Sequence, residues 1–212
     1  MRKLILKMSI SADGFVGGPK GEIDWIFKSY DSGATSWTVD TLWNTGVHVM
    51  GSRTFKDMAA YWPNSTEPYA PPMNEIPKVV FSRKGTIDMT ATTRALEDAI
   101  RLRKEGEAAG TPAILSSWTN PTIAAGDLAE EIARLKQEPG KPILAHGGAS
   151  FARSLVRHGL VDEYRLLVHP VALGRGLPLF SDLPEPLDLK LLSAMAFAGG
   201  AVAHVYEPAR PR

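Results

Sequence analysis

Short apolar runs that alternate with helical patterns constrain the fold of this chain more than any other feature. The runs are rich in Val, Ile and Leu, and most lack clean alternation with polar residues. They cover Leu4–Ile10, Val47–Met50, Lys78–Ser82, Ala113–Ser116, Pro142–Ala145, Tyr164–His169, Leu187–Leu192 and Ala201–Tyr206. Such runs indicate strands buried on both faces, as in a sheet that is covered by helices.

Helical spacing between the runs predicts the covering layers. Helices are expected over Ser36–Asn44, from near Thr54 to Trp62, over Asp127–Gln137 and over Ser150–His158. The first should bury Val39, Leu42 and Trp43. Residues 93–109 have a thin apolar stripe, which predicts a charged surface helix in an insertion at 90–112, and the proline-rich segment Asn64–Pro77 is predicted to be a loop.

The order of these elements predicts one α/β domain over residues 1–212. Strands and helices alternate until three strands follow one another at the end. This order favours a three-layer αβα architecture, with a mostly parallel central sheet of about eight strands and an antiparallel C-terminal end.

Charge and composition exclude several classes of function. The 24 basic and 23 acidic residues leave a net charge of +1, which offers no reason to expect nucleic acid or a membrane surface as a partner. The chain has no cysteine, so disulfides, thiolate catalysis and cysteine–zinc sites are excluded. Lys7 interrupts the first apolar run, which makes that run a poor signal peptide, and a cytoplasmic protein is the expectation.

Three strand-to-helix turns carry glycine or small polar residues, and a helix that starts there could bind phosphate through its free N–H groups. The first is Gly51-Ser52-Arg53-Thr54, the second is Gly147-Gly148-Ala149-Ser150, and the third is Ser82-Arg83 with the following Lys84-Gly85. From the residues alone, an ordinary capped helix, a tight turn and a solvated strand end stay open as alternatives.

Other signatures of catalysis are missing from the sequence. No Gly-x-Gly-x-x-Gly opens a helix, and there is no Walker A sequence and no Gly-x-Ser-x-Gly elbow. The five histidines lack metal-ligand spacing, so no metal site is expected.

The order of the motifs resembles the dihydrofolate-reductase superfamily, in particular the branch of the riboflavin-biosynthesis reductase, the RibD C-terminal domain. The segments that carry the resemblance are Ile10–Gly17, Met50–Phe55, Lys78–Arg83, Ala145–Phe151, Gly159–Tyr164 and Pro170–Phe180. The resemblance implies a dihydrofolate-reductase-like fold, a homodimer and an oxidoreductase that uses NADPH. It covers most of the chain except 90–112.

The same resemblance implies a role for each cofactor-binding residue. Val16 and Gly17 would face the nicotinamide. Gly51–Thr54 and Gly147–Ser150 would bracket the pyrophosphate, and Ser52, Arg53, Ser82 and Arg83 would surround the ribose and its phosphate. Two arginines with adjacent hydroxyls favour NADPH over NADH.

The substrate side departs from classical dihydrofolate reductases, because no carboxylate follows Trp25 at the corresponding place near Tyr30. Asp24, Asp31 and Asp40 are candidate substitutes: Asp24 as the catalytic or proton-supplying group, and Trp25, Asp31 and Asp40 as substrate-binding residues. The expected reaction is hydride transfer to a C=N or C=O carbon of a flat heterocycle, such as a pterin or an aminopyrimidine. A true dihydrofolate reductase, a non-catalytic ligand-binding protein on the same fold, and a flavin- or drug-binding oxidoreductase stay open as alternatives.

Overall fold

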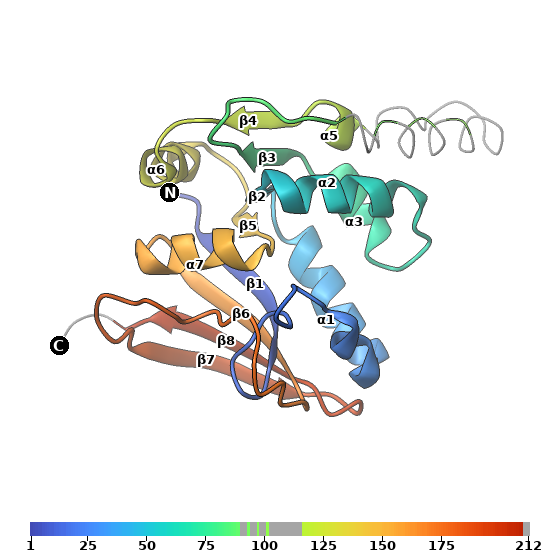
Figure 1. Ribbon diagram of the computed structural model, residues 1–212, viewed down its shortest axis with the longest axis vertical. Coiled ribbons are helices and arrows are strands. Elements are labelled where there is room, and N and C mark those ends of the chain that lie inside the picture. Colours follow the sequence, from blue (N-terminus) through green and yellow to red (C-terminus); the bar gives the residue numbers. More distant parts are fainter. Residues whose placement is uncertain (90–92, 94–96, 98–100, 102–115, 210–212) are drawn as a thin grey trace.

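An eight-stranded sheet forms the middle layer of the computed structural model, which describes residues 1–89, 93, 97, 101 and 116–209 (Figure 1). The strand order is β4-β3-β2-β5-β1-β6-β8-β7. The strands are β1 (Leu4–Ser11), β2 (Val47–Gly51), β3 (Lys78–Phe81), β4 (Thr122–Ala124), β5 (Ile143–Ala145), β6 (Glu163–His169), β7 (Leu189–Ala196) and β8 (Val202–Pro208). The pairs from β4 to β6 are parallel, and β8 pairs antiparallel with both β6 and β7. The predicted three-layer αβα fold is confirmed.

Helices cover the two faces of the sheet. On one face, α6 (Leu128–Gln137) and α7 (Ala149–Arg157) pack on a core that contains Leu4, Leu6 and Val49. On the other face, α1 (Ser32–Trp43), α2 (Ser52–Tyr61), α3 (Ala70–Glu75) and α5 (Ser116–Thr119) surround a second core that contains Ile5 and Met50. Successive strand residues point to opposite faces, so both cores use the same strands.

Helix α1 differs most from the sequence prediction. It begins at Ser32 instead of Ser36, because the side chain of Asp31 accepts hydrogen bonds from the N–H groups of Gly33 and Ala34 and so caps the helix earlier. Its buried residues are Ala34, Thr35, Thr38, Thr41 and Leu42. Trp43, which was expected to be buried, is 38% exposed. The hydrophobic pattern was misleading because this helix presents threonines to the sheet.

Two further predictions are wrong, and the start of one predicted helix differs slightly. The segment 64–77 contains α3, with prolines in its first turn, where a missing N–H costs nothing. Ser116, predicted to end a strand, starts α5, and the edge strand β4 lies further along at Thr122–Ala124. Helix α2 starts at Ser52, two residues before the predicted start. Most of the predicted 93–109 helix, and most of the insertion at 90–112, lie outside the described residues.

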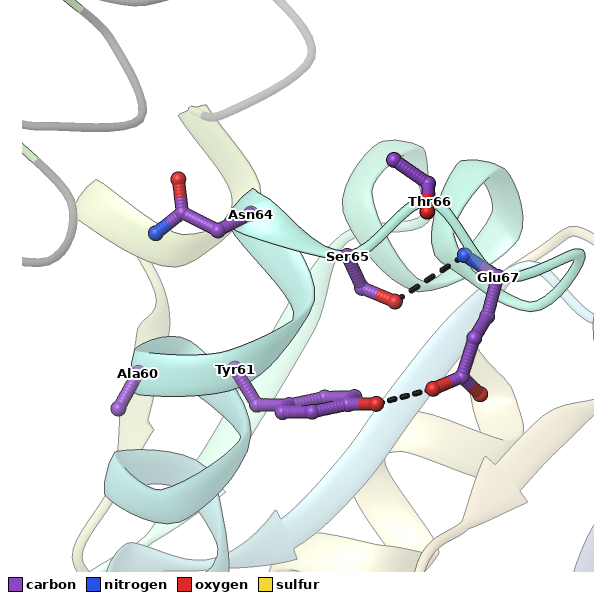
Figure 2. A pocket seen from close by; sticks show the side chains of 6 residues that line it. All are labelled: Ala60, Tyr61, Asn64, Ser65, Thr66 and Glu67. Atoms are coloured by element: carbon purple, nitrogen blue, oxygen red, sulfur yellow. Dashed lines mark hydrogen bonds between the residues drawn. The ribbon is translucent and has the colours of Figure 1, made fainter.

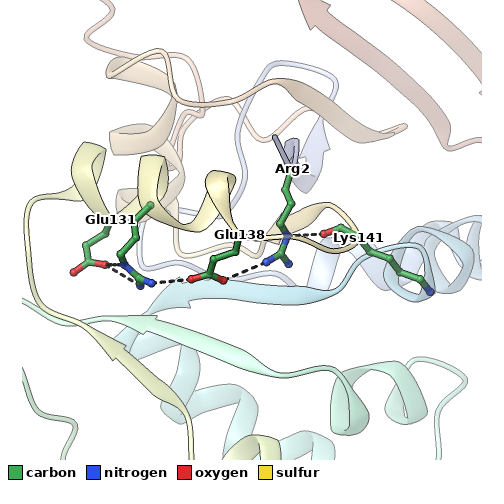
Figure 3. Close-up of polar contacts among 5 residues, drawn as sticks. Arg2, Glu131, Glu138 and Lys141 are labelled. Atoms are coloured by element: carbon green, nitrogen blue, oxygen red, sulfur yellow. Dashed lines mark hydrogen bonds and ion pairs between the residues drawn. The ribbon is translucent and has the colours of Figure 1, made fainter.

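Polar contacts tie the start of the chain to α6 (Figure 3). Arg2 donates from Nε to the carbonyl of Lys141 over 2.7 Å and pairs with Glu138 at 3.5 Å. Arg134 of α6 bridges Glu131 and Glu138. These contacts hold the loop between α6 and β5 against the beginning of β1.

In the part of the chain that the structure describes, no helix has the length and apolar character that a membrane crossing requires.

Candidate functional site

Two predicted cofactor-binding turns lie at the carboxyl ends of neighbouring parallel strands. Strand β2 leads through Gly51 into α2, and β5 leads through Gly147 and Gly148 into α7. Open parallel sheets bind ligands at this edge, where loops leave the strand ends.

The two turns are in contact. A Cβ atom added at Gly148 would lie 2.5 Å from Oγ1 of Thr54, and one added at Gly51 would lie 3.7 Å from Cβ of Phe151. Gly148 also has a φ of +93°, a conformation that side chains disfavour. The structure therefore brings together the segments 51–54 and 147–150 that the sequence placed on one ligand.

Both helices start without a side-chain cap. The N-cap residues are Gly51 for α2 and Gly148 for α7, and neither helix has a capping hydrogen bond from a side chain. In contrast, aspartates cap α1 and α6 through their carboxylates. The uncapped N–H groups and the positive ends of two helix dipoles favour an anion such as a pyrophosphate.

The third predicted segment adjoins the first, because β3 pairs with β2 and Phe81 lies opposite Gly51. Ser82 is buried, and its hydroxyl donates to the carbonyl of Thr86 over 2.7 Å. Arg53 and Arg83 are both exposed. Neither guanidinium has a hydrogen-bond or ion-pair partner among the described residues, so both remain available to a phosphate.

The loop after β1 packs on the loop after β6. Val16 donates its N–H to the carbonyl of Leu177, and Leu177 donates to the carbonyl of Gly17. Val16 also belongs to the core on the α6–α7 face. Asp13 accepts hydrogen bonds from the N–H groups of Leu173 and Gly174. These bonds, and above all the hydrogen bond that Ser11 donates, lower the pKa of Asp13 to about 2. The nicotinamide contacts of Val16 and Gly17 stay predictions.

A group of basic side chains occupies the sheet face that α1 covers. Lys7 of β1, His48 of β2, His146 after β5 and His169 of β6 all point to this side, since they alternate with residues of the opposite core. The rings of His48 and His146 lie edge to face, with centroids 4.4 Å apart. Both ring nitrogens of His48, and Nε2 of His146 and of His169, are buried without a hydrogen-bond partner among the described residues.

Burial keeps these histidines neutral. It is the largest cause that lowers the pKa of His146 to about 3 and that of His169 to about 4, and the charge of Lys7 adds to both effects. Burial also lowers the pKa of His48 well below its usual value and that of Lys7 to about 8. Lys7 has no hydrogen-bond or ion-pair partner among the described residues. Its lowered pKa lies near neutral pH, and its neighbours are imidazoles that also lack partners.

The predicted substrate-side residues have different surroundings. Trp25 is buried; its Nε1 donates to the carbonyl of Glu22, and its ring meets that of His169 edge to face. Asp24 and Asp40 are exposed. Asp31 accepts from Gly33, Ala34 and Gly199, so backbone groups occupy both of its oxygens. The structure thus brings Trp25, and none of the three aspartates, into contact with the basic group.

Sequence reasoning missed Lys7 and the three histidines as a group. Metal-ligand spacing was the wrong criterion for finding this group. In the described part of the chain, no three His, Cys, Asp or Glu side chains are grouped so that they could hold a metal ion. The usable signal was a titratable residue within, or directly after, a buried apolar run, because such a residue costs free energy unless it has a partner or a function.

A separate cavity of about 340 Å³ lies beyond the far end of α2 (Figure 2). Its lining includes Tyr61 and Glu67, whose side chains are hydrogen bonded, and Ala60, Asn64, Ser65 and Thr66. Helix α2 has 10 residues, so this cavity is about 15 Å from the glycine turns. It is not part of the candidate cofactor site.

Comparison with known proteins finds a relative in sequence and solved structures with the same fold. The protein YyaP of Bacillus subtilis (strain 168) is 32% identical over 207 residues, which are 97% of this chain and 94% of YyaP. A putative riboflavin biosynthesis protein from Shewanella sp. PV-4 superimposes with a TM-score of 0.67 at 20% identity, over 99% of this chain and all of that one.

A larger enzyme contains the same fold. The diaminohydroxyphosphoribosylaminopyrimidine deaminase/5-amino-6-(5-phosphoribosylamino)uracil reductase of Thermotoga maritima matches with a TM-score of 0.65 at 18% identity, over 98% of this chain and 57% of that enzyme. The RibD C-terminal domain family matches residues 2–203 of the chain. The chain therefore belongs to the RibD C-terminal domain family.

Proposed function

We propose that this protein is an NADPH-dependent reductase that delivers a hydride to a C=N or C=O carbon of a pyrimidine-type heterocycle. The observation that carries the proposal is the contact between two uncapped helix N-termini at Gly148 and Thr54, on the edge of the sheet that leads to the buried basic group. Membership of a reductase family supports it.

The residues around the glycine turns fit the dinucleotide. A side chain at position 148 would fill the space between the turns. Because Gly148 has none, the backbone there is open to a pyrophosphate. Ser52, Arg53 and Arg83 would hold the ribose phosphate, and the two arginines are the basis for preferring NADPH. The predicted contact of Ser82 does not fit, because its buried hydroxyl donates to the carbonyl of Thr86. When bound, NADPH supplies the hydride from its nicotinamide ring.

The sheet face under α1 would hold the substrate ring. Trp25 would form an apolar wall next to His169, and burial in this layer would exclude water from the reacting atoms. A proton must reach the reduced atom, and Lys7 is better suited than the exposed Asp24, because its pKa of about 8 lets the ammonium release a proton near neutral pH. Lys7 thus takes the role that the sequence assigned to Asp24.

Titration of the purified protein with NADPH and with NADH, followed by tryptophan fluorescence and calorimetry, tests the cofactor. We expect tighter binding of NADPH. Oxidation of NADPH in the presence of pyrimidine and pterin acceptors then tests the reaction. Absence of binding by either nucleotide would reject the reductase proposal, while binding without oxidation of any acceptor would favour a ligand-binding protein on this fold.

The homodimer and the cytoplasmic location stay predictions. Light scattering coupled to size exclusion measures the first directly, and cell fractionation measures the second.

A further inference from the structure

His169 and Ser29 form a buried polar pair on the substrate side. His169 ends β6, Ser29 ends the short helix η1 (Asp24–Ser29), and Oγ of Ser29 lies 2.7 Å from Nδ1 of His169. The residues are 4% and 7% exposed. The ring of Trp25 lies edge-on to the imidazole, with centroids 5.4 Å apart and an interplanar angle of 87°, so the ring plane is fixed from two directions.

The contacts of Ser29 select one tautomer of the imidazole. His169 is the sole hydrogen-bond partner of the Ser29 hydroxyl among the described residues. If Ser29 donates to Nδ1, the hydroxyl proton is satisfied and the ring proton sits on Nε2. That arrangement leaves one buried group unpaired, the Nε2–H, whereas the opposite one leaves two, the hydroxyl proton and the lone pair of Nε2, and therefore costs more free energy. The pair therefore favours the neutral ring with the proton on Nε2.

The Nε2–H group is then a buried donor without an acceptor, since Nε2 of His169 has no partner in the described part of the chain. Two charged residues of the described part of the chain, Lys7 and Asp31, do not supply an acceptor. The charged group that acts on His169 is the ammonium of Lys7, also a donor, and the Asp31 carboxylate is occupied by backbone N–H groups. A ligand atom that satisfies this site must accept a hydrogen bond.

We propose that His169 binds the substrate by donating from Nε2 to a ring carbonyl oxygen, and that Ser29 is the positioning residue that holds the required tautomer. The inference rests on the proposed function, because it places the substrate ring on the α1 side of the sheet. It adds a preference: rings with carbonyl oxygens bind, and diamino rings that present N–H groups at the same position do not.

Imidazole nitrogen chemical shifts, measured by NMR on histidine-labelled protein, test the tautomer without any turnover. Assignment uses His169→Gln, and His158→Gln is a matched control because His158 is exposed at the end of α7. We expect the Nε2–H form in the wild type, a mixture of tautomers in Ser29→Ala, and recovery of the Nε2–H form in Ser29→Thr. A wild-type ring protonated on Nδ1 would overturn the proposal.

Ligand recognition is tested with uracil and diaminopyrimidine as probes, on the protein with and without NADP⁺. Uracil is expected to shift the His169 Nε2 signal and to bind about tenfold more weakly to Ser29→Ala and to His169→Leu, as the loss of one buried hydrogen bond predicts. His169→Gln, which keeps a donor, should bind uracil better than His169→Leu does. Equal binding of the two probes, or a His169 signal that uracil leaves unchanged, would overturn the proposal.

The outcome is separable from that of the reductase proposal. Failure of NADPH to bind would reject the reductase assignment, whereas the tautomer of His169 and its response to uracil are measured independently. If NADPH binds and is oxidised, a rise in KM with little change in kcat for Ser29→Ala identifies a binding role, because the lost contact exists before hydride transfer.

Discussion

Gly148 and Thr54 approach so closely that a single methyl group at Gly148 would contact the threonine hydroxyl at 2.5 Å. Thr54 lies in the first turn of α2 and Gly148 directly precedes α7, and the elements between them along the chain include α3, β3, α5, β4, α6 and β5. Their contact joins the N-termini of α2 and α7 into one surface of free N–H groups, and this arrangement makes phosphate recognition by the backbone physically reasonable.

The substitution Gly148→Ala should disrupt that surface. The added Cβ must displace Thr54, and the φ of +93° strains any side chain, so we expect a loss of about 1–3 kcal/mol in the free energy of unfolding. NADPH binding should weaken by about tenfold or more. Urea unfolding and calorimetric titration measure the two effects.

Gly159→Ala is the control for strain alone. Gly159 has a φ of +62°, but a Cβ there would meet no atom within 4 Å. It should cost about 1 kcal/mol of stability and leave NADPH affinity unchanged. Equal loss of affinity in both variants would mean that the Gly148–Thr54 contact has no special part in cofactor binding.

Arg53 and Arg83 should determine the choice between NADPH and NADH. Each is exposed and without a partner among the described residues, and a guanidinium binds phosphate through paired hydrogen bonds. Arg53→Ala and Arg83→Ala are each expected to weaken NADPH binding about tenfold with little effect on NADH. Arg157→Ala, in the last turn of α7, is the control; an equal effect on the two nucleotides in either test variant would argue against a phosphate contact.

The buried ammonium of Lys7 should lower the free energy of unfolding at neutral pH, although the same group would supply the proton for the reaction. Its pKa is about 8 in the folded protein against 10.5 as the reference. The unfolded chain therefore binds more protons between these values, and stability should rise with pH through that window. Lys7→Met removes the buried charge and should stabilise the protein at neutral pH by up to roughly 3 kcal/mol, while reduction slows by about a hundredfold or more.

Urea unfolding of Lys7→Met across the same pH window measures the change in stability, with Lys190→Met as the exposed control. NADPH oxidation measures the loss of reductase activity. A Lys7→Met protein that is less stable at neutral pH and retains its activity would show that the ammonium is neither strained by burial nor needed for the reaction.

Apolar runs predicted most strands correctly because a strand that is buried on both faces must be apolar almost throughout. Leu4–Ser11 and Glu163–His169 differ from their predicted limits by one residue at one end. The runs failed for β4, an edge strand of three residues whose first residue is exposed. Short edge strands bury too little surface to require an apolar sequence.

The cofactor side of the candidate site could be predicted from local sequence, whereas the substrate side could not. Glycine turns have a local signature, since Gly148 needs its conformation whatever surrounds it. The substrate side depends on residues that meet only in the folded chain, such as His48 and His146, which are 98 positions apart in the numbering. Helix α1 was misread for the same reason, because its buried residues include the polar Thr35, Thr38 and Thr41.

The neutral histidines should make the protein sensitive to acid. His146 has a pKa of about 3 when folded and about 6.5 as the reference. Between these values the unfolded state binds more protons, so stability is complete above pH 6.5 and is lost as the pH falls toward 3. His146→Gln should lower the number of protons taken up on unfolding in this range by about one, as read from the slope of the free energy of unfolding against pH. His158→Gln measures the effect of removing an exposed imidazole. A slope for His146→Gln equal to that of the wild type would mean that His146 is already protonated in the folded protein, and the buried face under α1 would then carry a second positive charge beside Lys7.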